Sequence, residues 1–372
     1  MVRLRGLDAL RGLAAASVVF FHVAALMQVG NFWGKEVVLG WYRAVPLFFM
    51  LSAFALCAGY DGRLAEAHAI RRYCWNRLLR IAPLFLAVMT TTIFFRAWIG
   101  EAFPSVVELI VNYTFVFNVV YGMHGSLVWG GWSIGTEVLF YIAFPFLLAL
   151  GNSVARATVI LATAIVVAFV FNVIAARIGL TADDFAYMNV LNQLPFFVAG
   201  ILAYRTFQAL PDGRRLVGTV LAIAAAVIFI WLFLTGAQNW SKLGFPLGLE
   251  LVGIPLFCLL LAAATVPWKA TNNIAADMLG KFSYGLYLWH PFVIVFIEVK
   301  TPIVQATSGL PPLVRFGVFG VVVFVTALIT SIITYYLIER PALSLRRFRF
   351  VSGVLPQARP ALGVLAAGSD RP

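Results

Sequence analysis

Residues 4–24 of the chain have the sequence LRGLDALRGLAAASVVFFHVA, and the apolar character continues to Met27. A helix that spans a bilayer needs about 20 predominantly apolar residues, because lipid offers no hydrogen-bond partner to an open backbone. Arg3 and Arg5 precede the apolar run, as basic residues do in a secretory signal peptide, but no small-residue cleavage site closes it. We therefore expect this stretch to form an uncleaved first transmembrane helix.

Stretches of the same kind recur along the whole chain. Of the 372 residues, 62% are hydrophobic and 11% are charged, which is about half the charged share of a soluble globular protein. This composition excludes a water-soluble fold and predicts an all-α, polytopic membrane protein. Ten spans can be drawn, at residues 7–28, 44–60, 83–99, 132–150, 156–176, 189–205, 216–235, 246–265, 283–299 and 315–338.

The placement of basic residues predicts the orientation of these spans. The chain has 27 Lys and Arg residues against 15 Asp and Glu residues, a net charge of +12. An even number of spans puts both termini on one side, and placing them in the cytoplasm puts most of the basic residues there as well. The positive-inside rule therefore favours N-in and C-in. We expect no nucleic-acid partner, because the sequence contains no soluble basic domain.

One further apolar segment, 105–121, is long enough to be an eleventh span. Glu108, Asn112 and Asn118 interrupt it, and counting it as a span would move the arginines between 205 and 215 to the outer side. We therefore expect a re-entrant or interfacial segment at the outer face.

The cysteines and the C-terminal segment indicate no additional site. Cys57, Cys74 and Cys258 lie far apart without metal-ligand spacing, so we expect neither a zinc site nor a disulfide, and no metal. No internal repeat is visible, so an inverted-repeat transporter is not indicated. Residues 346–372 are rich in Pro, Gly and Ala, so we expect a disordered cytoplasmic tail after a membrane domain at 1–345.

Ionisable residues within spans are costly and are candidates for function. Arg11 and His22 lie eleven residues apart, close to three helical turns, and Asp8 is fourteen residues before His22. The three side chains therefore form a stripe on one helix face, with Arg11 at the cytoplasmic boundary and His22 past mid-membrane. The alternative is a histidine that pairs structurally with a neighbouring helix.

A carboxylate enters the fourth span at a depth similar to that of His22. It is Glu137, in the sequence GGWSIGTE at 130–137. A carboxylate beside an imidazole fixes its tautomer and raises its basicity, as a general base requires. The alternative is a structural network at the helix end.

An inner loop at 71–83 is the candidate anion site. Arg77 and Arg80 are neighbours on one face if the segment is helical, and guanidinium groups suit phosphate recognition. A basic anchor that contacts lipid phosphates is an equally good interpretation. In the ninth span Tyr287 and His290 stand three residues apart, and for these we favour a structural role.

The motifs together resemble the membrane-bound acyltransferase 3 family. The matching stretches occur in order as LDALRG with Arg11-x10-His22, FFMLSAFAL (48–56), Arg77-x-x-Arg80-Ile-Ala-Pro, WSIGTEVLFYIAFP (132–145), FSYGLYLWHP (282–291) and IERP (338–341). Ala53 departs from the Gly that the family often has there, and Gly135 stands where a bulkier residue is common. The resemblance covers roughly residues 5–341 and is closest to the stand-alone members without an extra esterase-like domain.

The resemblance implies transfer of an acetyl or other short acyl group from cytoplasmic acyl-CoA to a hydroxyl of a cell-surface glycan, such as an exopolysaccharide or lipopolysaccharide sugar. The Arg-x10-His pair is the family's active-site hallmark. Expected partners are therefore acyl-CoA, a glycan or small hydroxyl-bearing acceptor and membrane lipids, in a bacterial inner membrane, and a homodimer is compatible with this.

The corresponding hypothesis gives each candidate residue a role. Arg77 and Arg80, with Arg72, hold the CoA phosphates, and His22 is a general base or a transient acyl carrier that Glu137 orients. The remaining substrate or oxyanion candidates are Ser133, Tyr287, His290 and Asp8. The competing classes are a transporter or flippase of a lipid-linked glycan and a non-catalytic membrane scaffold.

Overall fold

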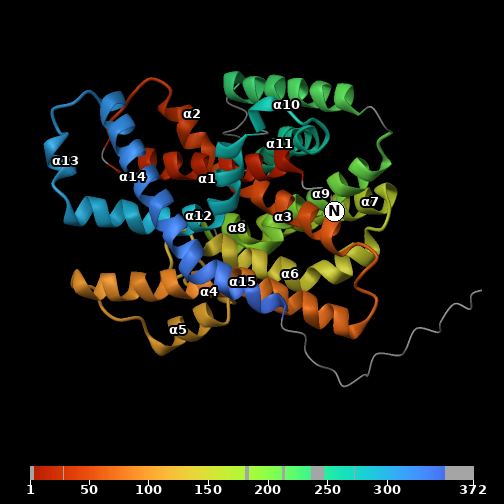
Figure 1. Ribbon diagram of the computed structural model, residues 1–372, viewed down its shortest axis with the longest axis horizontal. Helices are drawn as coiled ribbons and strands as arrows, with labels where there is room; N and C mark the ends of the chain where they lie inside the picture. Colours follow the sequence, from red (N-terminus) through yellow and green to blue (C-terminus); the bar gives the residue numbers. More distant parts are fainter. Residues whose placement is uncertain are drawn as a thin grey trace, which may run out of the picture.

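The computed structural model describes residues 4–27, 29–180, 184–211, 214–235, 247–271 and 273–347, and its regular elements over these ranges are all helical (Figure 1). Nine helical segments in this part of the chain are long and apolar enough to cross a bilayer, which confirms the expected all-α membrane protein. They are α1 (Arg5–Leu26), α2–η1–α3 (Lys35–Leu39, Gly40–Arg43, Ala44–Tyr60), α4 (Ala67–Trp98), α6 (Trp132–Leu150), α7 (Val154–Arg177), α8 and α9 (Phe185–Met188, Val190–Ala209), α10 (Arg215–Thr235), α12 (Ile274–Lys300), and α14–η6–α15 (Pro312–Thr334, Tyr335–Glu339, Arg340–Ser344).

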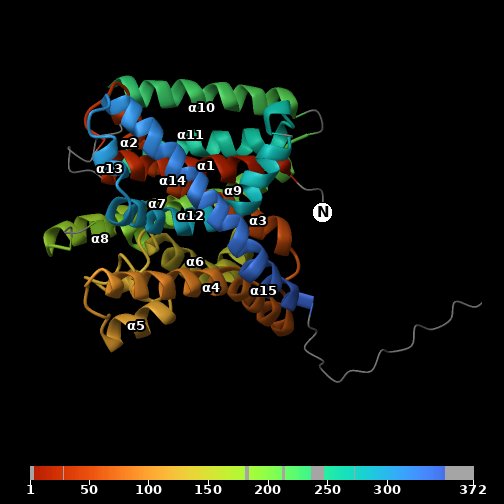
Figure 2. The same ribbon diagram turned by 60° about the vertical axis from the view of Figure 1, so that its left-hand side comes forward.

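The expected span at 246–265, the eighth of the ten, corresponds to α11 (Leu247–Thr265), of which Leu251–Thr265 is the apolar helix in the described part of the chain. The short elements that remain are α5 (Val106–Tyr113), η2 (Phe117–Val119), η5 (Lys269–Thr271), α13 (Ile303–Ala306) and η7 (Leu345–Arg347). Figure 2 shows α2, α5, α8 and α13 toward one end of the bundle, with the start of α1 and α15 toward the other. Both described ends of the chain thus lie on one side. The tail beyond Arg347, for which we expect disorder, lies outside the described residues.

The helices divide into a buried core and a lipid-facing periphery. Aromatic rings fill the core between α3, α6 and α9, where Phe140 lies 5.3 Å from Phe49 and 4.6 Å from Phe197 between ring centroids. By contrast, α10 exposes apolar side chains such as Leu216 and Leu234 along its length. A helix that exposes apolar residues in this way is stable only against lipid.

Two glycines let α1 and α12 approach closely. An added Cβ at Gly12 would lie 2.7 Å from Cβ of Leu279, and one at Gly280 would collide with the backbone of Asp8. These glycines therefore bring the face of α1 that carries Arg11 against α12. This contact positions the candidate site.

The segment 105–121 does not form a transmembrane helix. Its helix α5 has eight residues and begins with a capping box, in which Ser105 and Glu108 each accept a hydrogen bond from the other's backbone N–H. Eight residues rise about 12 Å, too little to cross a bilayer. Val106 and Ile110 expose their apolar side chains, as expected for a helix at the membrane interface.

The segment expected to be an inner loop is helical. Helix α4 begins at Ala67, sixteen residues before the expected start of the third span at Pro83, and continues through that proline. Tyr73 explains why this extension is ordered, because its buried side chain donates a hydrogen bond to the carbonyl of Tyr141 on α6 over 2.9 Å. The extension thereby fixes Arg77 and Arg80 on one helix face.

Candidate active site

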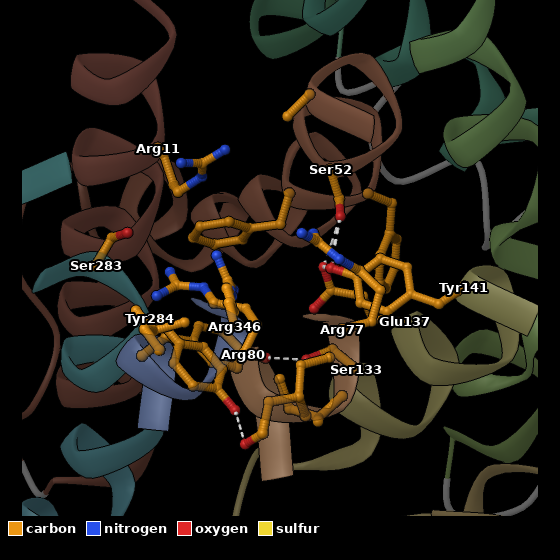
Figure 3. Close-up of a pocket in the computed structure, with 17 residues that line it drawn as sticks. Arg11, Ser52, Arg77, Arg80, Ser133, Glu137, Tyr141, Ser283, Tyr284 and Arg346 are labelled. Carbon is orange, nitrogen blue, oxygen red and sulfur yellow. Dashed lines mark hydrogen bonds between the residues drawn. The ribbon is translucent and has the colours of Figure 1, made fainter. Parts of the chain in front are cut away.

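A cavity of about 300 Å³ lies between α1, α3, α4, α6, α12 and the α15–η7 segment (Figure 3). Its polar lining combines predicted and unpredicted residues, namely Arg11, Ser52, Arg77, Arg80, Ser133, Glu137, Tyr141, Ser283, Tyr284, Tyr287 and Arg346. The apolar lining comes mainly from Phe48, Phe49, Ala55, Ile81, Ile134 and Leu343. The fold therefore brings together residues from the first helix to the last.

Four guanidinium groups surround one part of this cavity. Arg77 and Arg80 come from α4, Arg11 from α1 and Arg346 from η7 (Figure 3). Burial, together with the charges of Arg77 and Arg80, lowers the pKa of Arg346 to about 10, so this side chain is still protonated at neutral pH. Four like charges at close quarters favour an anionic ligand.

The acidic neighbours of these arginines compensate them only in part. Glu339 on η6 lies 3.1 Å from Nη1 of Arg80, and Asp8 lies 3.5 Å from Nη1 of Arg11. Arg77 is held instead by aromatic faces, with its guanidinium carbon 5.7 Å from the ring of Tyr60 and 5.6 Å from that of Tyr141. These contacts orient the arginines and leave positive charge facing the cavity.

Two buried donors at this end are not used by the protein. Nε of Arg77 and Nε of Arg346 have no hydrogen-bond partner in the described part of the chain. Arg346 is nevertheless anchored, because its Nη2 donates to the carbonyl of Asn76 over 3.2 Å. Buried donors without partners are costly. Both arginines also line the cavity, where their guanidinium groups can donate hydrogen bonds to an anion.

The structure changes two assignments among the arginines. Arg72 is exposed and does not line the cavity, because it lies on the outward face of α4. Arg346 does line it, although the sequence analysis assigned this residue to the tail. The local sequence, LRRFRF at 345–350, is basic and follows the last span, but it does not indicate that Arg346 reaches the cavity.

The expected contact between Glu137 and His22 is not formed. Glu137 instead accepts hydrogen bonds from Ser52 Oγ, over 2.7 Å, and from the hydroxyl of Tyr141. Similar depth in the membrane does not ensure contact, because the two side chains point in different directions around the bundle. The signal for these partners was present in the sequence: Ser52 is a polar residue in an apolar span, and Tyr141 stands four residues after Glu137.

Ser133 and Tyr287 form a hydroxyl chain at another part of the cavity. The two hydroxyl oxygens lie 2.7 Å apart, and Tyr287 donates to the carbonyl of Gly130 over 3.1 Å. Ser133 must therefore be the donor to Tyr287. The ring of Tyr287 lies 5.7 Å from that of His290 between centroids, which links the cavity to a buried histidine.

The two membrane histidines contact each other. Nε2 of His290 on α12 lies 3.1 Å from Nδ1 of His22 on α1, and His290 is completely buried. Nδ1 of His22 also lies 2.9 Å from the carbonyl oxygen of Val18 one turn earlier. The sequence indicated both histidines as candidates and left open that His22 pairs with a neighbouring helix, but it did not indicate that His290 is the partner.

Comparison with known proteins gives several relatives of similar length or longer. The chain is 24% identical to the acetyltransferase candidate ORF330 of Acidianus two-tailed virus, over 76% of this chain and 80% of that protein. It is 26% identical to the membrane-bound transacylase candidate BcsY of Komagataeibacter xylinus, over 92% and 83% of the two chains. No solved structure matches the chain.

A third relative is a longer protein. The peptidoglycan O-acetyltransferase candidate YrhL of Bacillus subtilis is 24% identical over 90% of this chain, which spans 54% of that protein. The sequence model of the acyltransferase domain, Acyl_transf_3, matches residues 4–335, a range that includes nearly all of the cavity lining. The chain therefore belongs to the acyltransferase 3 family of membrane acyltransferases.

Proposed function

We propose that this protein transfers an acetyl or other short acyl group from cytoplasmic acyl-CoA to a hydroxyl of a cell-surface glycan, in a bacterial inner membrane. The observation that carries the proposal is the cavity, which joins a group of four guanidinium side chains to the hydroxyl chain beside the His22–His290 pair. A cavity of this kind suits a ligand with a polyanionic end and a reactive end.

The arginine group fits the donor. CoA carries a diphosphate and a 3′-phosphate, and the guanidinium groups of the four arginines that line the cavity are donors that phosphate oxygens can accept from. The eleven residues from Arg11 to His22 rise about 16 Å along α1. The extended pantetheine arm has to cover this distance to present the thioester near His22.

The reaction needs a base, and His22 supplies one. As the acceptor hydroxyl oxygen bonds to the thioester carbonyl carbon, His22 takes the hydroxyl proton. The carbon–sulfur bond then breaks, and His22 gives that proton to the CoA sulfur. The products are the acylated acceptor and free CoA, and His22 returns to its starting form without a cofactor.

The negative charge that forms on the carbonyl oxygen needs hydrogen-bond donors. Tyr287 contacts the ring of His290 and hydrogen-bonds to Ser133, so these two hydroxyls are our candidates, although each already donates a hydrogen bond. In our proposal the Ser133 hydroxyl turns from Tyr287 to the oxyanion and donates its hydrogen bond there. The name of the Bacillus subtilis relative, a peptidoglycan O-acetyltransferase candidate, supports a glycan hydroxyl as the acceptor.

The test uses purified protein in lipid nanodiscs with acetyl-CoA labelled in the acetyl group and a panel of bacterial glycans. We expect free CoA and labelled glycan to form together. In His22→Gln the rate should fall at least about 100-fold, the usual contribution of a general base. His68→Gln makes the same change at an exposed histidine that pairs with Glu66, and it should retain full activity.

Two results would contradict the proposal. Unchanged transfer by folded His22→Gln would exclude His22 as the base. Movement of a lipid-linked glycan across a vesicle membrane without consumption of acetyl-CoA would instead identify a flippase.

A further inference from the structure

The hydrogen bond between the two histidines joins the helices that the glycines bring together. His290 lies one turn beyond Tyr287 on α12, and the centroids of the two imidazole rings are 4.8 Å apart. The side chain of His290 is completely buried, and the lining of the cavity includes neither His290 nor His22, which lie beyond Tyr287. His290 therefore contacts His22 without touching the proposed donor site.

The surrounding carbonyl groups determine which nitrogen atoms carry protons. Nδ1 of His290 lies 3.3 Å from the carbonyl oxygen of Leu286, and a carbonyl only accepts, so this nitrogen is protonated. In the neutral ring Nε2 of His290 then carries a lone pair, and this lone pair faces His22. Nδ1 of His22 has two acceptors nearby, the Val18 carbonyl and Nε2 of His290, and is therefore the protonated nitrogen.

This assignment leaves Nε2 of His22 unprotonated. One set of protons satisfies all three contacts: Nδ1–H of His290 points to Leu286, and Nδ1–H of His22 is shared between Val18 and His290. A general base needs a lone pair on the nitrogen that faces the substrate. The arrangement supplies that lone pair before any substrate arrives.

We propose that His290 is a positioning residue that holds His22 in the tautomer with Nε2 free, in the place where many hydrolases use a carboxylate. The proposal rests on the function given above. When His22 accepts the hydroxyl proton on Nε2, its Nδ1–H remains bonded to Nε2 of His290, which stabilises the imidazolium. The proton then leaves from Nε2 to the CoA sulfur, and His290 stays neutral throughout.

A neutral partner suits the location of this pair. Taking a charged carboxylate into the low-dielectric interior is costly. A carboxylate beside His22 would also stabilise the imidazolium more strongly, so His22 would release the accepted proton to the CoA sulfur less readily. The carboxylate of similar depth, Glu137, is held by Ser52 and Tyr141 instead. His290 orients the imidazole of His22 without adding a buried charge.

Two substitutions separate positioning from packing. His290→Gln keeps an oxygen acceptor near the position of Nε2, whereas His290→Leu keeps volume and removes the acceptor. We expect His290→Leu to lower kcat roughly 100-fold with KM for acetyl-CoA unchanged, since His290 does not line the donor cavity. His290→Gln should recover at least a tenth of the wild-type kcat.

Val293→Ala is the matched packing control, because Val293 is buried on the same helix, three residues beyond His290. It should lower the unfolding temperature and leave kcat within a few-fold of wild type. If His290→Leu keeps wild-type kcat, or if His290→Gln is as inactive as His290→Leu, positioning through the acceptor is excluded.

A second measurement reads the tautomer independently of activity. The chain has four histidines, so ¹⁵N NMR of histidine-labelled protein can be assigned with single His→Gln variants. We expect His22 to have a protonated Nδ1, an unprotonated Nε2 and a nitrogen–nitrogen coupling to His290 that disappears in His290→Leu. A protonated Nε2 on His22, or no coupling, would overturn the inference even if the enzyme is active. If the tautomer and coupling are found but no acetyl-CoA is consumed, the inference about the pair stands and the proposed function fails.

Discussion

At the scale of single residues, the arginines of the cavity differ in how far neighbouring groups balance their positive charge. Arg80 pairs with buried Glu339 and Arg11 with Asp8, while Arg77 rests on tyrosine rings. In the part of the chain that the structure describes, Arg346 makes one hydrogen bond, to a backbone carbonyl, and its pKa is lowered to about 10 by burial and by the neighbouring arginines. A bound anion would offset that repulsion, so Arg346 should gain from it strongly.

Replacing Arg346 should therefore weaken donor binding specifically. A hydrogen bond to a charged group contributes about 1.5–3 kcal/mol, so Arg346→Leu should raise KM for acetyl-CoA about 10- to 100-fold, with kcat little changed. Arg72→Leu, at an exposed arginine outside the cavity, is the matched control and should leave KM unaltered. Steady-state kinetics at varied acetyl-CoA measure both values, and an equal effect of the two substitutions would refute a specific role for Arg346.

The pKa of Arg346 sets the pH range of this effect. Its charge is present below about pH 10 and is lost as pH rises through that value, so donor binding should be lost in the same direction. The difference in KM between wild type and Arg346→Leu should be the same at neutral and mildly alkaline pH, where both Arg346 and the CoA phosphates keep their charge.

Single residues also show what could be inferred from the sequence about the candidate site. Buried ionisable and polar groups in spans pointed to Arg11, His22 and Glu137, because such groups are costly in lipid. The partner of His22 on another helix could not be predicted, because spacing along one helix gives depth and face but not which neighbouring helix lies opposite. Pairing of His22 with His290 therefore required the packing of α1 on α12.

At the scale of elements, apolar length predicted the helices well and their ends less well. α3 and α6 begin and end at the expected residues, because each apolar run is closed by polar residues or glycine. α4 extends far beyond its apolar part, since tertiary contacts such as that of Tyr73 with α6 order a polar stretch. The local sequence contains no signal for contacts of that kind.

The close contact of α1 and α12 gives a prediction at this scale. Gly280→Ala should push the helices apart, because the added Cβ would collide with the backbone of Asp8. Overpacking of this kind costs about 1–3 kcal/mol and should lengthen the contact between His22 and His290. We expect a lower unfolding temperature and a lower kcat, measured on purified protein.

Gly317→Ala on α14 is the matched control, because nothing lies within 4 Å of its added Cβ. Alanine favours helix over glycine by roughly 1 kcal/mol, so this variant should be as stable as wild type or more so, with full activity. Equal losses in the two variants would show that the α1–α12 contact has no special role.

At the scale of the whole molecule, both described ends lie on one side, and charge decides which side this is. The arginines of the cavity belong to the end that the positive-inside rule places in the cytoplasm, where acyl-CoA is made. The histidine pair lies farther along α1 and α12, toward the end that carries α5 and α13 (Figure 2). In our proposal this orientation lets the donor enter from the cytoplasm and react deeper in the membrane.

The orientation can be tested with cysteines at the two ends. Cys74 is exposed at the start of α4, and Ser308 is exposed after α13 at the opposite end. In intact cells a membrane-impermeant maleimide should label Ser308→Cys in a Cys74→Ser background, and it should label Cys74 of the wild type only after permeabilisation. The reverse pattern would place the arginines outside, where a cytoplasmic donor cannot reach them. Acyl transfer from cytoplasmic acyl-CoA therefore requires this orientation.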